Sequence, residues 1–330
     1  MEKHFFSGAN TPYGFYNCFN NICDFRKNGK AVHIKGGSGC GKSTFMKKFA
    51  KIATDNGYEI EYIHCASDPD SLDGIHFVGA NKVILDSTAP HNQDPLLVKF
   101  AEIIFDTQDF LNEELLKEKR SELLRLIKAK YSYYDKCYNI LKGAHALYQQ
   151  NEGTNIRLIE NIADMYDFKT HFRQTGKERK LFASGITSKG CVNFLENILQ
   201  GKIVAISDGE GSNLLLEEIN KKAKIAGYNT ETYYCPLFPD SKMEHLVIKD
   251  ADLSFTTVNN YHNCLKYDEY IKLTPKGKNQ KEIDLLVNSA VNALKKARLK
   301  HSEIEKIYGS AMDYKKMDDS LEKIYSFLEL

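Results

Sequence analysis

Residues 30–44 read Lys30-Ala31-Val32-His33-Ile34-Lys35-Gly36-Gly37-Ser38-Gly39-Cys40-Gly41-Lys42-Ser43-Thr44, and they contain the spacing Gly36-x-x-x-x-Gly41-Lys42-Ser43. The four residues 31–34 are apolar or β-branched for the most part, which favours a strand. After the glycines, apolar residues recur at the three-to-four spacing of an amphipathic helix: Phe45, Met46, Phe49, Ile52 and Ala53. The stretch therefore predicts a strand, a glycine-rich loop and a helix, in that order.

This order is the structural context of a phosphate-binding loop. Glycines let successive backbone N–H groups point at phosphate oxygens, and the helix N-terminus adds a partial positive charge. We expect Lys42 to reach the β- and γ-phosphates and the Ser43 hydroxyl to hold Mg²⁺. The chain resembles the P-loop NTPases over about its first hundred residues, which implies that it binds ATP or GTP. The residues expected to bind the nucleotide are Gly36, Gly37, Ser38, Gly39, Cys40, Gly41, Lys42, Ser43 and Thr44.

A second apolar strand is predicted at Lys82-Val83-Ile84-Leu85-Asp86. An acid at the end of such a strand has the form of a Walker B element, whose Asp helps to hold Mg²⁺. Ligands bind beyond the carboxyl ends of the strands in α/β sheets, so we expect Asp86 to meet the glycine loop at one edge. The Mg²⁺ ligands predicted from the sequence are therefore Ser43 and Asp86.

The residues after Asp86 read Ser87-Thr88-Ala89-Pro90-His91 and lack the Glu that activates water in many ATP-driven machines. We expect the activating group elsewhere, and the candidates are Asp68, Asp70, Asp73 and His91. Each of these residues also fits an ordinary place in a turn. Because Pro-Asp-Ser recurs at 239–241, Asp70 is better explained by a structural role. The predicted catalytic residues are Lys42, Asp86, Asp68, Asp73 and His91.

Composition fits a globular protein with room for two domains, because the chain has 330 residues, 42% of them apolar and 27% charged. The formal net charge of +1 gives no global electrostatic reason to expect nucleic acid as a partner. No apolar run reaches the roughly 18 residues of a membrane helix, so we expect neither a membrane segment nor a signal peptide. The eight cysteines form no C-x-x-C pair, which favours reduced thiols and a cytoplasmic location.

A helical block is expected from about residue 95 to about residue 165. Its first part carries apolar residues at helical spacing: Leu96, Leu97, Phe100, Ile103 and Ile104. Residues 113–130 are dense in Leu, Glu, Lys and Arg, which have high helix propensity. The arginines available there and just beyond to stabilise phosphoryl charge are Arg120, Arg125, Arg157 and Arg173. The block is a candidate lid or partner surface.

The two halves of the chain resemble each other. Residues 6–17 align with 182–193, and residues 29–34 align with 201–206. Pro69-Asp70-Ser71 aligns with Pro239-Asp240-Ser241 in the same order. We interpret this pattern as a duplicated domain, with an active copy at residues 1–174 and a second copy at residues 175–330.

The second copy has lost the residues that handle nucleotide. Its loop reads Asp208-Gly209-Glu210-Gly211-Ser212-Asn213-Leu214, about two residues shorter than the first, with no lysine at the position of Lys42. Two acids stand where phosphates would bind, which is electrostatically unfavourable. The position of Asp86 falls on Thr256 in this alignment. We therefore expect a degenerate copy that keeps its sheet and binds no nucleotide.

The layout resembles a bacterial family of tandem P-loop ATPase-like proteins, some of which are labelled nucleotide kinases. The resemblance rests on residues 5–14, 36–44, 64–73, 86–91 and 181–190. It implies an α/β fold of two tandem P-loop NTPase-like three-layer domains, with mainly parallel sheets, helical additions and a degenerate second copy. It also implies ATP binding.

Three functions are compatible with these residues. The first is Mg²⁺-dependent ATP hydrolysis at a single N-terminal site. The second is a small-molecule or nucleotide kinase, in which the 68–73 loop binds the acceptor and the helical block excludes water. The third is a nucleotide-gated interaction protein with slow turnover, which binds a protein partner or a second copy through the helical block or the second domain. No guanine-recognition motif follows the Walker B strand, which favours ATP over GTP.

Overall fold

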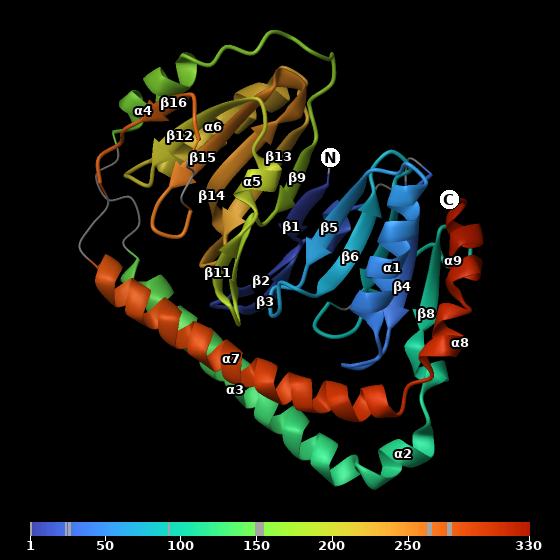
Figure 1. Cartoon of the computed structure of the whole chain (residues 1–330). Coiled ribbons are helices and arrows are strands. Elements are labelled where there is room, and N and C mark those ends of the chain that lie inside the picture. Colours follow the sequence, from blue (N-terminus) through green and yellow to red (C-terminus); the bar gives the residue numbers. More distant parts are fainter. Residues whose placement is uncertain are drawn as a thin grey trace.

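Each half of the chain contributes one six-stranded sheet in the computed structural model, which describes residues 2–23, 25, 28–91, 93–148, 155–262, 266–275 and 279–330 (Figure 1). The first sheet has the strand order β1-β5-β6-β7-β4-β8. Its strands are β1 (Lys3–Phe6), β4 (Lys30–Lys35), β5 (Ile60–His64), β6 (Leu72–Phe77), β7 (Lys82–Asp86) and β8 (Glu102–Asp106). β4 runs parallel to both of its neighbours, whereas β6 runs antiparallel to both of its own.

The second sheet repeats the first, with the order β9-β13-β14-β15-β12-β16. Its strands are β9 (Glu178–Leu181), β12 (Lys202–Ser207), β13 (Thr230–Cys235), β14 (Phe238–Ile248), β15 (Leu253–Val258) and β16 (Glu269–Ile271). Every pairing has the direction of its counterpart, and three of the five pairings in each sheet are parallel. The α/β class and the internal repeat predicted from the sequence are thus confirmed at the level of strand order.

The register of the two sheets corrects one position in the alignment of the halves. Ile34 on β4 lies opposite Asp86 on β7, and the equivalent Ile206 on β12 lies opposite Thr257 on β15. The counterpart of Asp86 is therefore Thr257 and not Thr256. The second half has one more residue between Cys235 and Thr257 than the first has between Cys65 and Asp86. An alignment without gaps misses this extra residue and therefore pairs Asp86 with Thr256.

Helices pack on the outer face of each sheet. They are α1 (Lys42–Asp55), α8 (Tyr314–Asp318) and α9 (Leu321–Leu328) on the first, and α4 (Ile156–Asp164) and α6 (Ser212–Ile225) on the second. α1 and α6 each follow a glycine in the left-handed region, Gly41 with φ 75° and Gly211 with φ 80°. Glycine adopts this conformation without the steric penalty of a Cβ atom, which explains its place before both helices.

The two halves exchange helices. α4 belongs to the first half in sequence, yet Ile159 and Ala163 pack in the core of the second half. α8 and α9 follow the second half, yet Met317, Ile324 and Leu328 pack in the core of the first. Two long helices, α3 (Arg120–Leu147) and α7 (Gln280–Ser310), carry the chain across in opposite directions, side by side along one edge of the molecule (Figure 1). Each sheet is therefore completed by the other half.

The inner faces of the two sheets meet in a shared core. Its fully buried members include Phe5 and Ile63 from the first half, and Leu181 and Tyr233 from the second. The smaller elements beside this core and the long helices are β2 (Gly8–Thr11), β3 (Gly14–Asn17), α2 (Glu113–Glu118), β10 (Ser184–Thr187), β11 (Gly190–Asn193) and α5 (Leu195–Ile198). Phe19 and Ile22, at the 3-10 helix η1 (Phe19–Asn21), and Leu195 and Ile198 on α5 pack in the same core, so short helical segments and the second half together cover the inner face of the first sheet. The expectation of three layers in each half stays a prediction.

Ion pairs across the shared core repeat the same symmetry. The Arg179 guanidinium donates to both carboxylate oxygens of Glu61, with Nη2 2.7 Å from Oε2. In the reciprocal position, the Lys3 ammonium bonds the carboxylate of Glu231. Phe6 and Phe182 exchange two backbone hydrogen bonds of 2.9 and 3.0 Å. The halves are thus related by an approximate two-fold axis that passes between these two phenylalanines.

The expected helical block at 95–165 is wrong at its start. Residues 102–106 form strand β8 beside β4, a short 3-10 helix η3 (Thr107–Phe110) follows, and α-helix begins only at α2. The apolar residues that suggested a helical stripe include Leu96 and Phe100, which are 88% and 82% exposed. Pairing with β4 decides the conformation there, since backbone hydrogen bonds to a neighbouring strand override local periodicity.

Within the described ranges, no helix has the length and apolar character needed to cross a membrane.

Candidate functional site

The glycine loop joins β4 to α1, as the sequence predicts. Gly36, Gly39 and Gly41 all have positive φ, and a Cβ on Gly36 would lie 1.8 Å from Oγ1 of Thr107. The Lys42 ammonium folds back across this loop. It donates to the carbonyl oxygens of Gly36 at 2.7 Å and Gly37 at 2.9 Å. The loop thus holds one cation at its mouth, where the amide groups of residues 36–41 and the N-terminus of α1 also lie.

Asp86 ends β7 next to this loop. Its Oδ2 lies 3.5 Å from Lys42 Nζ, and its Oδ1 accepts a hydrogen bond of 2.9 Å from the amide of Thr88. The Thr88 hydroxyl in turn donates to the Gly36 carbonyl at 2.9 Å. The predicted meeting of Asp86 with the glycine loop at one sheet edge is therefore confirmed.

The Ser43 side chain already has a backbone partner. Its Oγ accepts a hydrogen bond of 2.9 Å from the amide of Leu72, at the start of β6. The hydroxyl proton is not used by this bond, and Ser43 Oγ retains a lone pair. Thr44, the next residue, is exposed on α1. The structure thus places Lys42, Ser43 and Asp86 around one point, and it links that point to β6.

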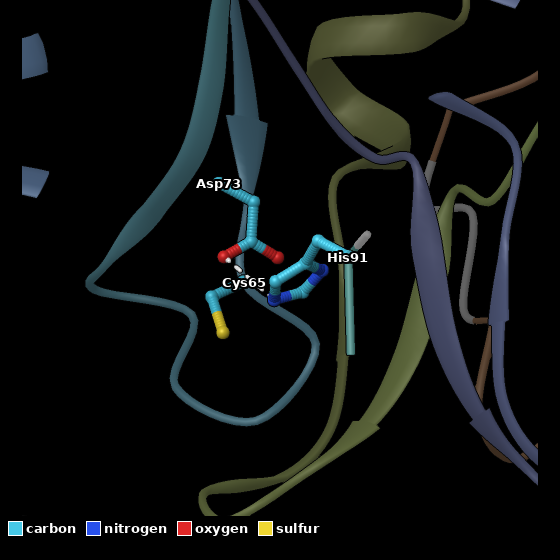
Figure 2. A group of neighbouring side chains, drawn as sticks. All are labelled: Cys65, Asp73 and His91. Atoms are coloured by element: carbon cyan, nitrogen blue, oxygen red, sulfur yellow. Dashed lines mark ion pairs between the residues drawn. The ribbon is translucent and has the colours of Figure 1, made fainter. Parts of the chain in front are cut away.

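A group of three side chains lies at the same edge of the first sheet: Cys65 after β5, Asp73 on β6 and His91 in the turn after β7 (Figure 2). One ligand-type atom from each lies within 4.8 Å of the other two. His91 Nε2 is 3.6 Å from Asp73 Oδ1, and the imidazole packs edge-on against Phe15 and Phe19. Asp73 and His91 are only 3% and 7% exposed. Two of the residues predicted to be catalytic are thus brought together.

Burial sets the electrostatics of this group. Burial raises the pKa of Asp73, the neighbouring Asp86 raises it further, and His91 and Lys42 oppose the shift. Burial also raises the pKa of the Cys65 thiol well above its ordinary value, and the Asp73 carboxylate adds to that shift. The thiol is therefore protonated near neutral pH unless a cation binds beside it.

The two remaining acids of the 68–73 loop lie apart from this group. Asp68 Oδ2 accepts a hydrogen bond of 3.1 Å from Nε of Arg298, whose Nη2 lies 3.0 Å from the same oxygen in an ion pair. Asp70 is largely exposed and bonds the Lys189 ammonium of the second half. Its counterpart Asp240 likewise bonds a side chain of the other half, the Tyr16 hydroxyl. The Pro-Asp-Ser segments therefore hold the halves together, which agrees with the structural role predicted for Asp70.

The C-terminal part of α7 and the start of α8 cover the glycine loop. The Tyr314 hydroxyl donates to the Gly39 carbonyl at 2.9 Å, and Ser38 Oγ lies 3.4 Å from Nδ1 of His301. A Cβ on Gly39 would lie 2.5 Å from the carbonyl oxygen of Glu305, so only glycine fits there. This cover comes from the second half of the sequence. No local pattern around residues 298–314 indicates it, and sequence reasoning missed it.

Two cations near the loop were also missed. Arg298 on α7 donates to Glu305 at 2.7 Å as well as to Asp68. Lys130 on α3 is partly buried, and burial lowers its pKa, as does the charge of Lys42. The arginines that the sequence offered were those at positions 120, 125, 157 and 173, and none of them has a described ion pair with Asp68 or Asp86. Arg298 lies near Asp68 because α7 crosses from the second half to the first, and the sequence pattern does not indicate this crossing.

The second half carries a different arrangement at the matching place. Asp208 stands at the position of Gly36, and its Oδ2 accepts from Lys242 Nζ and from Asn259 Nδ2, both at 3.1 Å. Lys242 also lies 3.2 Å from Glu244 and donates to the Tyr148 hydroxyl at 2.7 Å. A cavity of about 400 Å³ lies beside this loop, with Asp208, Tyr148 and Lys272 in its wall. The negative charge of Asp208 in this loop is thus neutralised by the buried ammonium of Lys242.

Comparison with known proteins adds no identification. No protein-family model matches the chain, no curated protein is detectably similar to it, and no solved structure matches its fold. The resemblance to tandem P-loop ATPase-like proteins stays a prediction from the sequence motifs.

Proposed function

We propose that the protein binds ATP with Mg²⁺ at a single site in its first half and hydrolyses it there. On this proposal the first half is a P-loop NTPase domain and the second is a copy that has lost nucleotide binding. The observation that carries the proposal is the position of Lys42. Its ammonium is held by the Gly36 and Gly37 carbonyls, 3.5 Å from Asp86, at the N-terminus of α1.

The residues at this point supply what phosphoryl transfer requires from a protein. The amides of residues 36–41 and the N-terminus of α1 would bind phosphate oxygens, and Lys42 would exchange its carbonyl partners for them. Ser43 Oγ and the Asp86 carboxylate are the oxygen donors suited to Mg²⁺. When bound, the ion would neutralise charge on the phosphates. Asp73 and His91 are the titratable groups next to Asp86, and no Glu follows Asp86 to act as a base.

Calorimetry with a non-hydrolysable ATP analogue and Mg²⁺ tests the proposal directly. The wild type is expected to bind one nucleotide per chain, and Lys42→Ala is expected to lose this binding while its circular dichroism stays unchanged. Titration with the GTP analogue gives the base preference, for which ATP is expected. Absence of binding would contradict the proposal, and two sites per chain would show that the loop at 208–211 also binds nucleotide.

A second candidate function is a nucleotide-gated interaction protein with slow turnover. It is favoured by the contact of α7 and α8 with the glycine loop, through Tyr314 and Gly39 above all. Phosphates that enter the loop would have to change this contact, and the change would reach the long helix pair. Hydrogen exchange measured with and without the ATP analogue separates the two functions. Gating predicts altered protection at residues 298–314, and a simple hydrolase predicts changes confined to the loop and α1. Kinase activity stays a prediction from the sequence, since no feature of the 68–73 loop favours an acceptor site.

A further inference from the structure

The contact between His91 and Asp73 differs from an ordinary buried histidine–carboxylate pair in the same sheet. His33 bonds Ser87 Oγ at 2.8 Å through Nδ1 and Glu102 at 2.9 Å through Nε2, so both ring nitrogens are satisfied. His91 Nε2 instead stops 3.6 Å from Asp73 Oδ1. Among the described residues, His91 Nδ1 and Asp73 Oδ2 have no hydrogen-bond partner, although both atoms are buried. Buried polar atoms without a partner are uncommon and call for an explanation, of which a bound ion is one; His76 Nε2 in the same sheet and His262 Nδ1 in the second half also lack a partner.

The spacing of the group fits a tetrahedral metal ion. Ligand atoms around Zn²⁺, at bond lengths of about 2.0–2.3 Å, lie about 3.3–3.7 Å from one another. The separation of 3.6 Å between His91 Nε2 and Asp73 Oδ1 falls in this interval, and the third donor, Cys65 Sγ, is within 4.8 Å of both. The sulfur would have to approach by about 1 Å, which a small side-chain rotation permits. Figure 2 shows that the three side chains are neighbours and that each comes from a separate segment of the chain.

From this geometry we propose that Cys65, Asp73 and His91 bind a Zn²⁺ ion beside the glycine loop. Thiolate and imidazole select zinc over the hard cation Mg²⁺, which prefers oxygen ligands. Three protein ligands leave a fourth position for water or a substrate oxygen, the arrangement of an open zinc site. Zinc would keep the Cys65 thiolate deprotonated and would fill the gap between His91 Nε2 and Asp73 Oδ1, which do not hydrogen-bond to each other. Asp73 and His91 are then zinc ligands and not free bases.

The second half tests this reading, because it retains the same three positions. Strand register makes Cys235 the counterpart of Cys65 and Glu244 that of Asp73. His262 follows Thr257 by five residues, as His91 follows Asp86. Glu244 Oε2 and His262 Nε2 are also 3.6 Å apart.

The second half, however, carries a cation of its own at this place. Lys242 is almost fully buried, and its ammonium lies 3.2 Å from Glu244 and 3.1 Å from Asp208. The first half has no counterpart of Lys242, because Ser71 aligns with Ser241 and strand register makes Leu72 the counterpart of Met243. Within the described ranges, no lysine or arginine forms an ion pair with Asp73. We therefore assign the metal to the first half alone, since the ammonium of Lys242 would repel a metal ion from Glu244.

Metal analysis of the purified full chain tests the assignment. Protein produced with zinc in the medium and dialysed against metal-free buffer is expected to hold one zinc per chain. After replacement by Co²⁺, the wild type is expected to show a sulfur-to-cobalt charge-transfer band and the visible absorption of a tetrahedral site. Cys65→Ser should lose the charge-transfer band and weaken metal binding about tenfold or more, because even partners outside the first shell change affinity by about 10–100-fold.

Cys235→Ser is the matched control, and it is expected to retain both the metal and the band. Lys42→Ala separates this inference from the proposed function, because it should lose nucleotide binding and keep its zinc. No metal in the wild type, or one zinc that survives in Cys65→Ser with an unchanged cobalt spectrum, would overturn the assignment. Two zinc ions per chain would overturn the restriction to the first half. Circular dichroism of each variant shows whether it folds, and the cobalt spectrum of the wild type stands without any variant.

Discussion

The loops at residues 36–41 and 208–211 occupy the same place in their sheets, but the cation beside each loop comes from a different element and has different partners. Each follows the strand next to one edge strand of its sheet, β4 or β12, and ends in a left-handed glycine at the start of a helix. In the first half the cation is Lys42, on the helix, and its partners are two backbone carbonyls and Asp86. In the second half the cation is Lys242, on a strand, and its partners are the carboxylates of Asp208 and Glu244.

This difference separates what the fold needs from what a ligand site needs. A lysine held by carbonyl oxygens can exchange them for a phosphate, since the carbonyls are weaker partners than an anion. A lysine buried between two carboxylates is neutralised and has nothing to exchange. The comparison teaches that the same sheet accommodates a cation on the helix in one half and on a strand in the other. The following predictions test this comparison.

Removal of Lys242 should have the largest effect. Lys242→Met leaves Asp208 and Glu244 buried without their cation, which is expected to lower the free energy of unfolding by about 3–5 kcal/mol. Urea denaturation gives this value. Ser71→Ala, just before the strand of the first half that corresponds to the strand of Lys242, should change it by about 1 kcal/mol. Equal losses in the two variants would show that the ammonium does not hold the second loop.

Removal of Lys42 should act on turnover and not on stability. Lys42→Ala is expected to reduce the rate of ATP hydrolysis by about 10²–10³-fold, because a charge-stabilising donor is lost at the phosphates. Release of free phosphate measures the rate. Ser212→Ala, at the position of Lys42 in the second half, should leave the rate within about twofold of the wild type. A rate that survives Lys42→Ala would disprove the site assignment.

The contact between Tyr314 and the glycine loop should contribute less. Tyr314→Phe removes the hydrogen bond to the Gly39 carbonyl and is expected to lower stability without nucleotide by about 1 kcal/mol. Tyr308→Phe is the control, since its ring, beside Gly37, keeps its packing. If the loop and α8 are coupled, the loss in Tyr314→Phe should shrink when the ATP analogue is bound. An equal loss with and without nucleotide would argue against gating.

The smallest effect is expected at Glu305, which lies above Gly39. Burial raises the pKa of Glu305, but hydrogen bonds from His301 and Arg298 outweigh burial and lower this pKa from 4.5 to about 2. The charged form stabilises the fold above pH 4.5, and this contribution is lost as the pH falls toward 2. Glu305→Gln should therefore destabilise the protein by about 0.5–1 kcal/mol near neutral pH, since the carboxylate is partly exposed. The difference from wild type should shrink between pH 4.5 and 2 in thermal melts. A difference that does not depend on pH would refute the ion pairs.

The sequence predicted what depends on local pattern. The order of strand, glycine loop and helix around Gly36 was correct, and so was the position of Asp86 at the end of a neighbouring strand. The internal repeat predicted a second sheet of matching design. These features follow from periodicity and from strand edges, which leave a direct trace in the chain.

The rest depends on contacts between distant segments. β8 was mistaken for helix because its pairing with β4 outweighs the helical spacing of the residues around it. Arg298 and Tyr314 reach the loop only because α7 crosses from one half to the other. Asp73 and His91 were each candidates from the sequence, but their meeting with Cys65 requires the antiparallel entry of β6 beside β5. No spacing in the chain encodes that meeting.

The exchange of helices between the halves has a consequence for the origin of the chain. A protein with one copy of the repeat would cover the outer face of its sheet only with its own first helix, the counterpart of α1 or α6, because its last helices reach away from it, as α4 and α9 do here. Two such chains could cover each other by swapping these helices around a two-fold axis. The protein thus has the architecture of a helix-swapped dimer within one chain, and each half can change its own loop while its helices continue to complete the other half.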